Sequence, residues 1–527
     1  MKNKKYSAIL AGTLSCAMMI TACGAADTAS AANTNTISSL QEETSDNSGG
    51  TASADAADAT RAEAAPASAV LSKEDLVINE TIENSEDGGH AILADGEEKT
   101  YNNVQVIKTG EADGDEADFY GENAAVFATN GGTLNLSGLL VETAGTHANG
   151  VFSYGEGTTV NISDSYIETS GNCSGGIMTT GGGTMNAENL TIVTSGNSSA
   201  AIRSDRGGGV VTVMGGSYTT SGKGSPAIYS TADITVSDAT LTSTSSQGVV
   251  VEGNNSVTLN NVDLTADNNT KNSDHSDFYQ AVMIYQSMSG DADEGLSSFT
   301  MRGGSLLNKN GEIFFVTNTA TDITLEDVSI TNEGDDVFLR ASAAGWGSDG
   351  SNGGQVNLYC YDQILDGDML VDEISKLNLY LQGSSVYSGA INPDGEEGEV
   401  YVEIAENATW ILEGDSYITS LTCDADSIDL NGHTLYVNGT VYEEGTRSEG
   451  EALEITMPGG NGGMGGERPD GMPDGKPGEG GPEGGAGGPG GDGSTPPDMN
   501  GEGGPEGGAG GPGGDGSTPP AKPDSAE

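Results

Sequence analysis

The chain has 527 residues, of which 82 are glycine and only 5% are aromatic, and its formal net charge is −60. A surface that binds nucleic acid must neutralise phosphates, so 79 acidic residues against 19 basic ones exclude that class of partner and also disfavour an anionic membrane surface. Few aromatic residues and many turn glycines favour a narrow repeat structure over several globular cores.

The first 23 residues have the parts of an export signal. Three lysines precede a short apolar stretch, residues 7–19, and the letters ITAC end at Cys23. This ending resembles the lipobox of bacterial lipoproteins, which implies cleavage before Cys23 and attachment of lipid to its thiol. The alternative is an ordinary signal peptide with an incidental cysteine. We therefore expect residues 1–23 to be a lipoprotein signal and the lipid at Cys23 to hold the exported chain on the outer face of the cell membrane.

Residues 24–71 consist mainly of Ala, Ser, Thr, Asp and Asn. Such a segment cannot bury enough apolar surface to offset the entropy that it would lose on ordering, so we predict a disordered tether. Apolar segments near residues 76–78 and 104–107 then indicate the first strands. They predict a cap that covers the open end of the repeat structure.

From residue 125 to residue 265 one pattern recurs at nearly fixed intervals of 25, 26, 25, 26 and 21 residues. Its apolar position is filled by Val126, Val151, Ile177, Ile202, Ile228 and Val249. An apolar-polar-apolar triplet follows each of them, and a third apolar segment follows the triplet. This period predicts stacked coils of three short strands each, with Gly, Asn and Ser at corners that need positive φ.

The pattern continues beyond residue 265 with longer insertions, so we expect about twelve coils within residues 72–447. Residues 448–527 differ in composition. The string GEGGPEGGAGGPGGDGSTPP begins at residue 478 and again at residue 501. It is rich in Gly and Pro without a strict three-residue period, which predicts a disordered tail.

Three strands per coil, polar-centred triplets such as Leu134-Asn135-Leu136 and a step of 21 to 26 residues resemble the right-handed parallel β-helix of pectate lyases, related polysaccharide enzymes and bacterial adhesins. The resemblance covers residues 72–447 and implies an all-β solenoid. Together with the lipobox and the tail, the chain resembles adhesin-like, carbohydrate-binding β-helix lipoproteins of bacteria. The resemblance implies a cell-surface protein that binds polysaccharide or surface glycans, and we expect it to be a monomer.

Alternation within the strands predicts two outward columns of side chains. The triplets supply a polar column: Asn135, Asn161, Asn186, Thr212, Thr235, Thr258, Thr300, Thr324, Asn357 and Asn378. Such a column is either a repeating surface for a polymer or crystal face, or a row of residues that simply suit exposed stacked strands. The second interpretation is the simpler one.

The first strands of the coils predict a second outward column, which contains aromatic and charged residues. Its outward residues, with two neighbours further along the same face, are the candidate ligand-binding set: Phe127, Phe152, Tyr154, Arg203, Asp205, Arg206 and Tyr229, with Met178 in the same line. Aromatic rings stack on sugar rings, and Arg203 and Arg206 can hold the carboxylate of a uronic acid by bidentate hydrogen bonds. The alternative is that a loop or the N-terminal cap covers this column.

No residue is predicted to be catalytic, because the four histidines are scattered and no GxSxG or HExxH motif occurs. A polysaccharide lyase or hydrolase on the same scaffold is the alternative function, with Asp205 beside Arg203 and Arg206 as a sparse version of its site. A structural spacer of the envelope is a third. The acidic stretch Asp291, Asp293 and Glu294 is either a loose Ca²⁺ site or a solvated loop.

Beyond Cys23 the chain contains Cys173, Cys360 and Cys423. An odd number at wide spacing gives neither a disulfide framework nor a CxxC metal motif. We expect these residues to be small core or turn residues, with a bridge between Cys360 and Cys423 as the alternative.

Overall fold

The structure is a computed structural model that describes residues 70–287, 289–395 and 397–458. The predicted export signal, lipidation at Cys23, the tether up to residue 69 and the tail from residue 459 lie outside these residues. In the described part, no helix has the length and apolar character needed to span a membrane.

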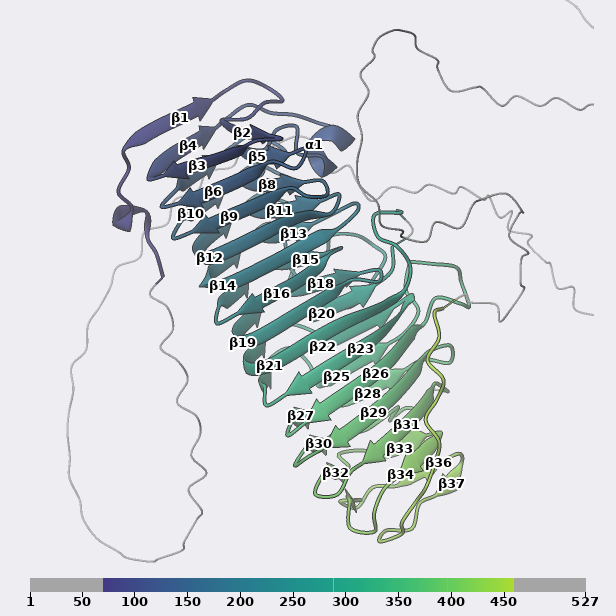
Figure 1. The fold of residues 1–527 in the computed structure, drawn as a ribbon. Helices are drawn as coiled ribbons and strands as arrows, with labels where there is room; N and C mark the ends of the chain where they lie inside the picture. Colours follow the sequence, from purple (N-terminus) through teal and green to yellow (C-terminus); the bar gives the residue numbers. More distant parts are fainter. Residues whose placement is uncertain (1–69, 288, 396, 459–527) are drawn as a thin grey trace, which may run out of the picture. The chain divides into compact units, whose positions relative to one another are not determined.

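The chain winds as a parallel β-helix whose coils stack along one axis, from β1 at one end to β37 at the other (Figure 1). A regular coil holds three short strands, as in β5 (Val126–Thr129), β6 (Thr133–Ser137) and β7 (Leu140–Thr143). Each strand pairs in parallel with the equivalent strand of the next coil. The prediction of an all-β parallel β-helix with three strands per coil is confirmed.

The first strands of the coils form an eleven-stranded sheet, called sheet 1 below. Its strands, in order, are β2 (Ile92–Asp95), β5, β8 (Val151–Tyr154), β11 (Ile177–Thr180), β13 (Ile202–Ser204), β15 (Ile228–Ser230), β18 (Val249–Glu252), β20 (Gln280–Tyr285), β22 (Glu312–Thr317), β25 (Val337–Ala341) and β28 (Asp368–Val371).

The second and third strands form a nineteen-stranded sheet, called sheet 2 below. Besides β6 and β7 it contains β1 (Glu80–Asn84), β3 (Glu98–Asn102), β4 (Val104–Lys108), β9 (Thr159–Ser163), β10 (Tyr166–Thr169), β12 (Gly183–Thr194), β14 (Gly209–Thr220), β16 (Asp233–Ser237), β17 (Thr240–Ser243), β19 (Ser256–Ala266), β21 (Leu296–Asn308), β23 (Thr319–Glu326), β24 (Ser329–Asn332), β26 (Gly354–Tyr361), β29 (Lys376–Gln382), β31 (Glu399–Ile404) and β34 (Ser420–Thr422).

Two small sheets and two short helices complete the described fold. A four-stranded sheet holds β27 (Ile364–Asp366), β30 (Val386–Ser388), β32 (Thr409–Ile411) and β35 (Ile428–Asp429). A three-stranded sheet holds β33 (Ser416–Ile418), β36 (Leu435–Val437) and β37 (Thr440–Val441). The helices are the 3₁₀ turn η1 (Lys73–Asp75) and α1 (Asp115–Phe119).

The interior of the coils is an apolar column, as the repeat predicts. Val126, Val151 and Ile177 are paired in register, and the column continues through Ile202, Ile228 and Val249. All six side chains are buried in one cluster that runs the length of the helix. Burying an aliphatic side chain of this size contributes about 1.5–3 kcal/mol, so the column is a main source of stability.

Polar residues with positive φ turn the chain at its corners. Asn130, Asp164 and Asn189 have φ of 53°, 46° and 53°. Asn and Asp adopt this left-handed conformation more readily than other non-glycine residues, because their side chains can hydrogen-bond locally. The predicted role of Asn at the corners is confirmed.

The polar column on the triplets is a hydrogen-bonded ladder at its N-terminal end. The Asn161 amide donates to Asn135 Oδ1 at 2.9 Å, and the Asn186 amide donates to Asn161 Oδ1 at the same distance. The assignment of Asn357 and Asn378 to this column is wrong, because the register places Asn357 beside Asp322 and Tyr359 beside Thr324.

The apolar alternation of β26 explains that error. Val356, Leu358 and Cys360 all point inward and are buried, so two overlapping apolar-polar-apolar triplets occur in this strand. The triplet centred on Tyr359, not the one centred on Asn357, continues the ladder column.

The cysteines within the fold behave as small core or turn residues. Cys360 and Cys423 are buried and are not joined by a disulfide, and Cys173 lies in a turn with φ of 54°. The alternative of a bridge between Cys360 and Cys423 is therefore wrong. Cys173 is considered further below.

Candidate functional site

The outward column of sheet 1 is in register, as expected, but it is not an open surface. Phe127, Phe152, Met178, Arg203 and Tyr229 pair one after another across β5, β8, β11, β13 and β15. Phe152 and Met178 are fully buried and Phe127 is 7% exposed. The expectation of an exposed apolar stripe is wrong, and the alternative of a covered column is confirmed.

The segment around α1 covers the N-terminal part of the column. This segment comprises residues 111–123. Phe127, Phe152 and Met178 form an apolar cluster with Ala124, the residue that follows it. Thr180 Oγ1 donates a hydrogen bond of 2.7 Å to the backbone carbonyl of Phe119. Because these rings are enclosed, Phe127 and Phe152 are not available to stack on a sugar.

Tyr154, another predicted site residue, is half-buried at the edge of this cover. Its ring lies edge-on to Tyr120, with ring centroids 5.6 Å apart. Tyr154 packs against the apolar cluster below it and does not line the cavity described next.

Two long loops cover the C-terminal part of the column. Trp346 packs edge-on against Tyr285 at 5.2 Å, and Phe278 packs against Phe315 at 5.6 Å. The Arg340 guanidinium lies 3.9 Å from the centre of the Phe278 ring, which adds a cation–π contact. Insertions that the sequence places in corner loops thus fold back over sheet 1.

A cavity of about 150 Å³ remains between the two covers. Three of the predicted site residues, Arg203, Asp205 and Tyr229, line it. The other lining residues are Asp118, Phe119, Ser198, Ala200, Gly224, Pro226, Glu252, Asn272, Tyr285, Ser287, Ser289 and Asp291. The structure therefore brings together part of the predicted set and adds residues from both covers.

Arg203 is held between two carboxylates at the floor of the cavity. Its Nη2 donates to Asp118 Oδ1 and to Asp205 Oδ2, each at 3.0 Å. The residue is 8% exposed, and its Nη1 is buried without a hydrogen-bond partner. Buried polar groups are nearly always paired, so an unpaired guanidinium nitrogen in a cavity wall indicates that a ligand or ordered water completes the network.

Arg206 is also paired with carboxylates of this chain. Its Nε donates to Asp291 at 2.7 Å and its Nη1 to Asp115 at 3.0 Å. The guanidinium lies 3.7 Å from the centre of the Phe119 ring. Because both arginines already have acidic partners, neither is positioned as a free cation for the carboxylate of a uronic acid.

The two carboxylates beside Arg203 differ in acidity. Burial raises the pKa of Asp118, but the charges of Arg203 and His147 outweigh burial and lower that pKa to about 2. Burial raises the pKa of Asp205 to about 7, because Arg203 offsets its desolvation only in part and the Asp118 charge opposes ionisation. At neutral pH the cavity thus contains an ionised carboxylate and one that carries a proton much of the time.

Two tyrosine hydroxyls donate to a third carboxyl group that lines the cavity. Glu252 Oε2 accepts hydrogen bonds from Tyr229 and, at 2.9 Å, from Tyr285. Burial raises the pKa of Glu252 and of both tyrosines. Glu252 and Tyr285 occupy paired positions on β18 and β20.

Sequence reasoning missed Glu252, Tyr285, Asp118 and Phe119. A signal for the first two was present. Glu252 stands three residues after Val249 and Tyr285 three after Val282, as Asp205 stands three after Ile202. No periodic signal marks Asp118 and Phe119, which belong to a covering segment outside the repeat. Of the acidic loop residues considered for Ca²⁺, Asp291 is bound to Arg206.

The cavity combines three features: aromatic walls, carboxyl groups of different acidity and one unpaired buried donor. These features suit a small ligand rich in hydroxyl groups, because carboxylates accept from hydroxyls and aromatic faces cover apolar ring faces. No protein-family model, curated protein or solved structure matches this chain.

Proposed function

We propose that this chain is an exported, lipid-anchored surface protein that binds polysaccharide through the cavity over Arg203, Asp205 and Tyr229. The proposal extends the resemblance of the repeats and the N-terminal signal to adhesin-like lipoproteins. One sugar residue of the polymer, at a chain end or on a branch, enters the cavity, and the rest of the polymer lies outside. The observation that carries the proposal is a lined, sugar-sized cavity on an otherwise covered sheet face.

The size of the cavity supports a single ring. Pockets for drug-sized ligands measure about 300–1,000 Å³, and a cavity of about 150 Å³ is large enough for one six-membered ring. A space of this size takes one ring and not a longer stretch of the polymer. Recognition of one terminal or branching unit is therefore the arrangement that fits.

The charges of the cavity select the type of sugar. Asp118, Asp205, Glu252 and Asp291 line it together with one arginine, Arg203, which Asp118 and Asp205 already hold. An added sugar carboxylate would meet like charges, which costs binding free energy, whereas hydroxyl or amino groups can donate to the carboxylates. The proposed ligand is a neutral or amino-bearing sugar, in place of the uronic acid that the two arginines suggest in the sequence.

A second candidate function is hydrolysis of the bound sugar. The observation in its favour is the pKa of Asp205, about 7, since a carboxyl group that keeps its proton at neutral pH can serve as a general acid. Asp205 would then protonate the glycosidic oxygen as its bond to the anomeric carbon breaks. A water molecule would add to that carbon and give its proton to the ionised Asp118. This candidate differs from simple binding in that it predicts product release.

A screen with the purified full chain separates these functions. A glycan array should show binding to neutral or amino-sugar glycans and weaker binding to uronic-acid glycans of the same length. Absence of binding to every glycan would remove the proposal in favour of a structural spacer. Release of reducing sugars from the bound glycan, abolished in Asp205→Asn, would establish hydrolysis.

A further inference from the structure

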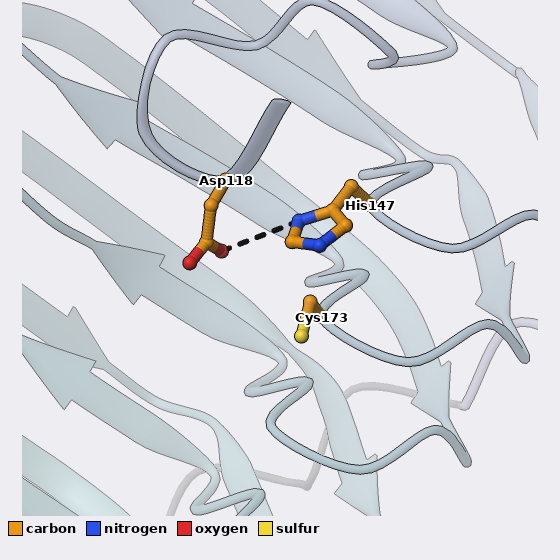
Figure 2. A group of neighbouring side chains, drawn as sticks. All are labelled: Asp118, His147 and Cys173. Carbon is orange, nitrogen blue, oxygen red and sulfur yellow. Dashed lines mark ion pairs between the residues drawn. The ribbon is translucent and has the colours of Figure 1, made fainter. Parts of the chain in front are cut away.

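Three side chains that can ligate a metal ion converge beside the cavity. Figure 2 shows Asp118 and His147 facing each other, with Cys173 beside them, on three separate segments of the chain. One ligand atom of each, a carboxylate oxygen, a ring nitrogen and the thiol sulfur, lies within 4.8 Å of the other two. No other group of three or more such side chains is found in residues 70–458 as far as the structure describes them.

The coil geometry places two of these residues side by side. His147 and Cys173 occupy the same turn position in successive coils, with φ of 56° and 54°. The backbone N–H of His147 donates to Asn172 O at 2.9 Å, and the N–H of Cys173 donates to Asn197 O at 2.8 Å. Because stacked strands are about 4.8 Å apart, side chains at one turn position of neighbouring coils meet. Asp118 reaches them from α1.

His147 has a buried ring nitrogen that makes no hydrogen bond and that lies close enough to Asp118 for an ion pair only when the ring is protonated. The side chain is 3% exposed, and its Nδ1 makes no hydrogen bond. Nδ1 lies 3.5 Å from Asp118 Oδ1, and two ligands of a tetrahedral zinc ion at ~2.1 Å are about 3.4 Å apart. The separation of these two atoms therefore already matches that of a shared metal ion.

The position of the thiol is less closely matched. Sulfur and nitrogen on a tetrahedral zinc ion are about 3.6 Å apart, whereas no two of the three ligand atoms here are more than 4.8 Å apart. A closure of at most about 1 Å therefore brings the sulfur into place, and rotation of the Cys173 side chain about χ1 is the movement available for it.

The ligand types select the class of metal. Thiolate and imidazole ligands favour Zn²⁺ and similar ions, whereas Ca²⁺ and Mg²⁺ take oxygen ligands. Three protein ligands leave a fourth position open, as in zinc sites that hold a water molecule or substrate. Arg203, which donates to Asp118 at 3.0 Å, would fix the orientation of that carboxylate as an outer-shell partner.

We propose that Asp118, His147 and Cys173 form a binding site for Zn²⁺ with its fourth position open. Asp118 also lines the cavity, so the ion would lie at the cavity wall. The proposal stands apart from sugar binding, because it is carried by the three ligands and the unsatisfied nitrogen alone.

Titration of the full chain with Co²⁺ tests the site, since Co²⁺ takes the place of Zn²⁺ and its thiolate complexes have a charge-transfer absorption in the near ultraviolet. A large excess of Ca²⁺ occupies the acidic surface, which binds divalent ions without specificity. The expected result is one equivalent of Co²⁺ with the charge-transfer band, displaced by Zn²⁺. Absence of bound Co²⁺ under these conditions would overturn the proposal.

Cys173→Ser and His147→Asn are the variants that assign the ligands. Ser198 occupies the equivalent turn in the next coil with φ of 54°, so this turn accepts serine, and asparagine tolerates the same conformation. Cys173→Ser should abolish the band, and each variant should weaken Co²⁺ binding by more than the ~10–100-fold that loss of an outer-shell partner costs. His433→Asn, the same substitution at a histidine outside both the cavity and the proposed metal site, is the matched control and should retain both the band and the affinity. A band that persists in Cys173→Ser would contradict the proposal.

Discussion

Arg203 is the residue on which the architecture of the cavity depends. It stands in an outward position of β13. If this face of sheet 1 were open to solvent, water would hydrate the charge of Arg203. Here it is buried, and its Nη2 is paired with Asp118 from the covering segment and Asp205 from its own coil. Removing one partner of a buried ion pair costs about 3–5 kcal/mol, so this pairing holds the cover and the coil together.

The raised pKa of Asp205 predicts a specific dependence of stability on pH. The folded protein keeps the proton on Asp205 up to about pH 7, while the unfolded chain loses it near pH ~3.9. The stabilisation is therefore complete below about pH 3.9 and is lost as the pH rises through about 7, by at most about 4 kcal/mol. Asp205→Asn removes this contribution.

Guanidinium unfolding of both proteins at pH 5 and pH 8 measures the difference. The free energy of unfolding should fall between these pH values by less in Asp205→Asn than in the native chain. Equal decreases in the two proteins would show that Asp205 ionises normally.

The residues of the cavity could be predicted from the sequence only in part. The alternation of inward and outward positions correctly placed Arg203, Asp205 and Tyr229 on one face of sheet 1. Extending the position of Asp205 along the repeat would also have reached Glu252. Asp118 could not be found in this way, because it lies 85 residues before its partner Arg203 in a segment without periodicity.

At the scale of elements, the covers decide what sheet 1 can do. The short helix α1 and its flanks enclose Phe127, Phe152 and Met178, and the loops that carry Phe278 and Trp346 enclose the other end of the column. The repeat pattern fixes the strands, since each coil buries its own Val/Ile position. It carries no information on how an insertion folds back, because that depends on contacts between loop residues and coils distant in sequence.

Phe119→Ala should loosen the α1 cover without unfolding the coils. Phe119 is 1% exposed, and loss of a buried phenylalanine ring costs about 3–5 kcal/mol. Here the loss lowers the free energy that favours the closed cover over the locally open one. A loss of about 3 kcal/mol raises the open population ~100-fold. Limited proteolysis should then cut within residues 111–123 much faster than in the native chain.

Trp346→Ala is the matched variant for the other cover. It should leave the segment 111–123 as resistant as in the native chain and increase cleavage within the loop 342–353 instead. If Phe119→Ala lowers the thermal stability of the whole fold and produces no local cleavage, the cover is an integral part of the coil structure.

The ladder on sheet 2 shows how far a pattern can be followed. The triplets from Asn135 to Thr324 are in the register that their apolar neighbours predict. In β26 the inward-facing residues continue as far as Cys360, so the strand contains two equivalent triplets. Only the pairing with β23 shows which triplet continues the column. The repeat period was enough to predict the fold, but the register of the irregular coils could be assigned only from the structure.

At the scale of the whole molecule, the described coils stack along one axis (Figure 1), and the cavity lies against the outward face of sheet 1. A binding protein of this kind acts only where it is held, and the proposed lipid at Cys23 would keep it at the cell surface. The proposed anchor would also offset the acidic composition, because an anionic membrane repels a chain with a net charge of −60.

Cys23→Ala tests the anchor. In cells that express the full chain, this variant should appear in the medium or the soluble fraction, while the native chain is recovered with the membrane. Fractionation followed by immunoblotting measures the distribution. Retention of Cys23→Ala in the membrane fraction would show that another segment holds the protein there.

Calorimetric titration of the preferred neutral or amino-sugar oligosaccharide into the native chain, Tyr229→Ala and Tyr154→Ala is the most direct test of the proposed site. Tyr229 lines the cavity, whereas Tyr154 lies on the same sheet face outside it. Losing the Tyr229 ring should weaken binding ~10-fold or more, equivalent to about 1.4 kcal/mol, and Tyr154→Ala should bind like the native chain. Equal affinities in all three proteins would contradict the assignment of the cavity as the sugar-binding site.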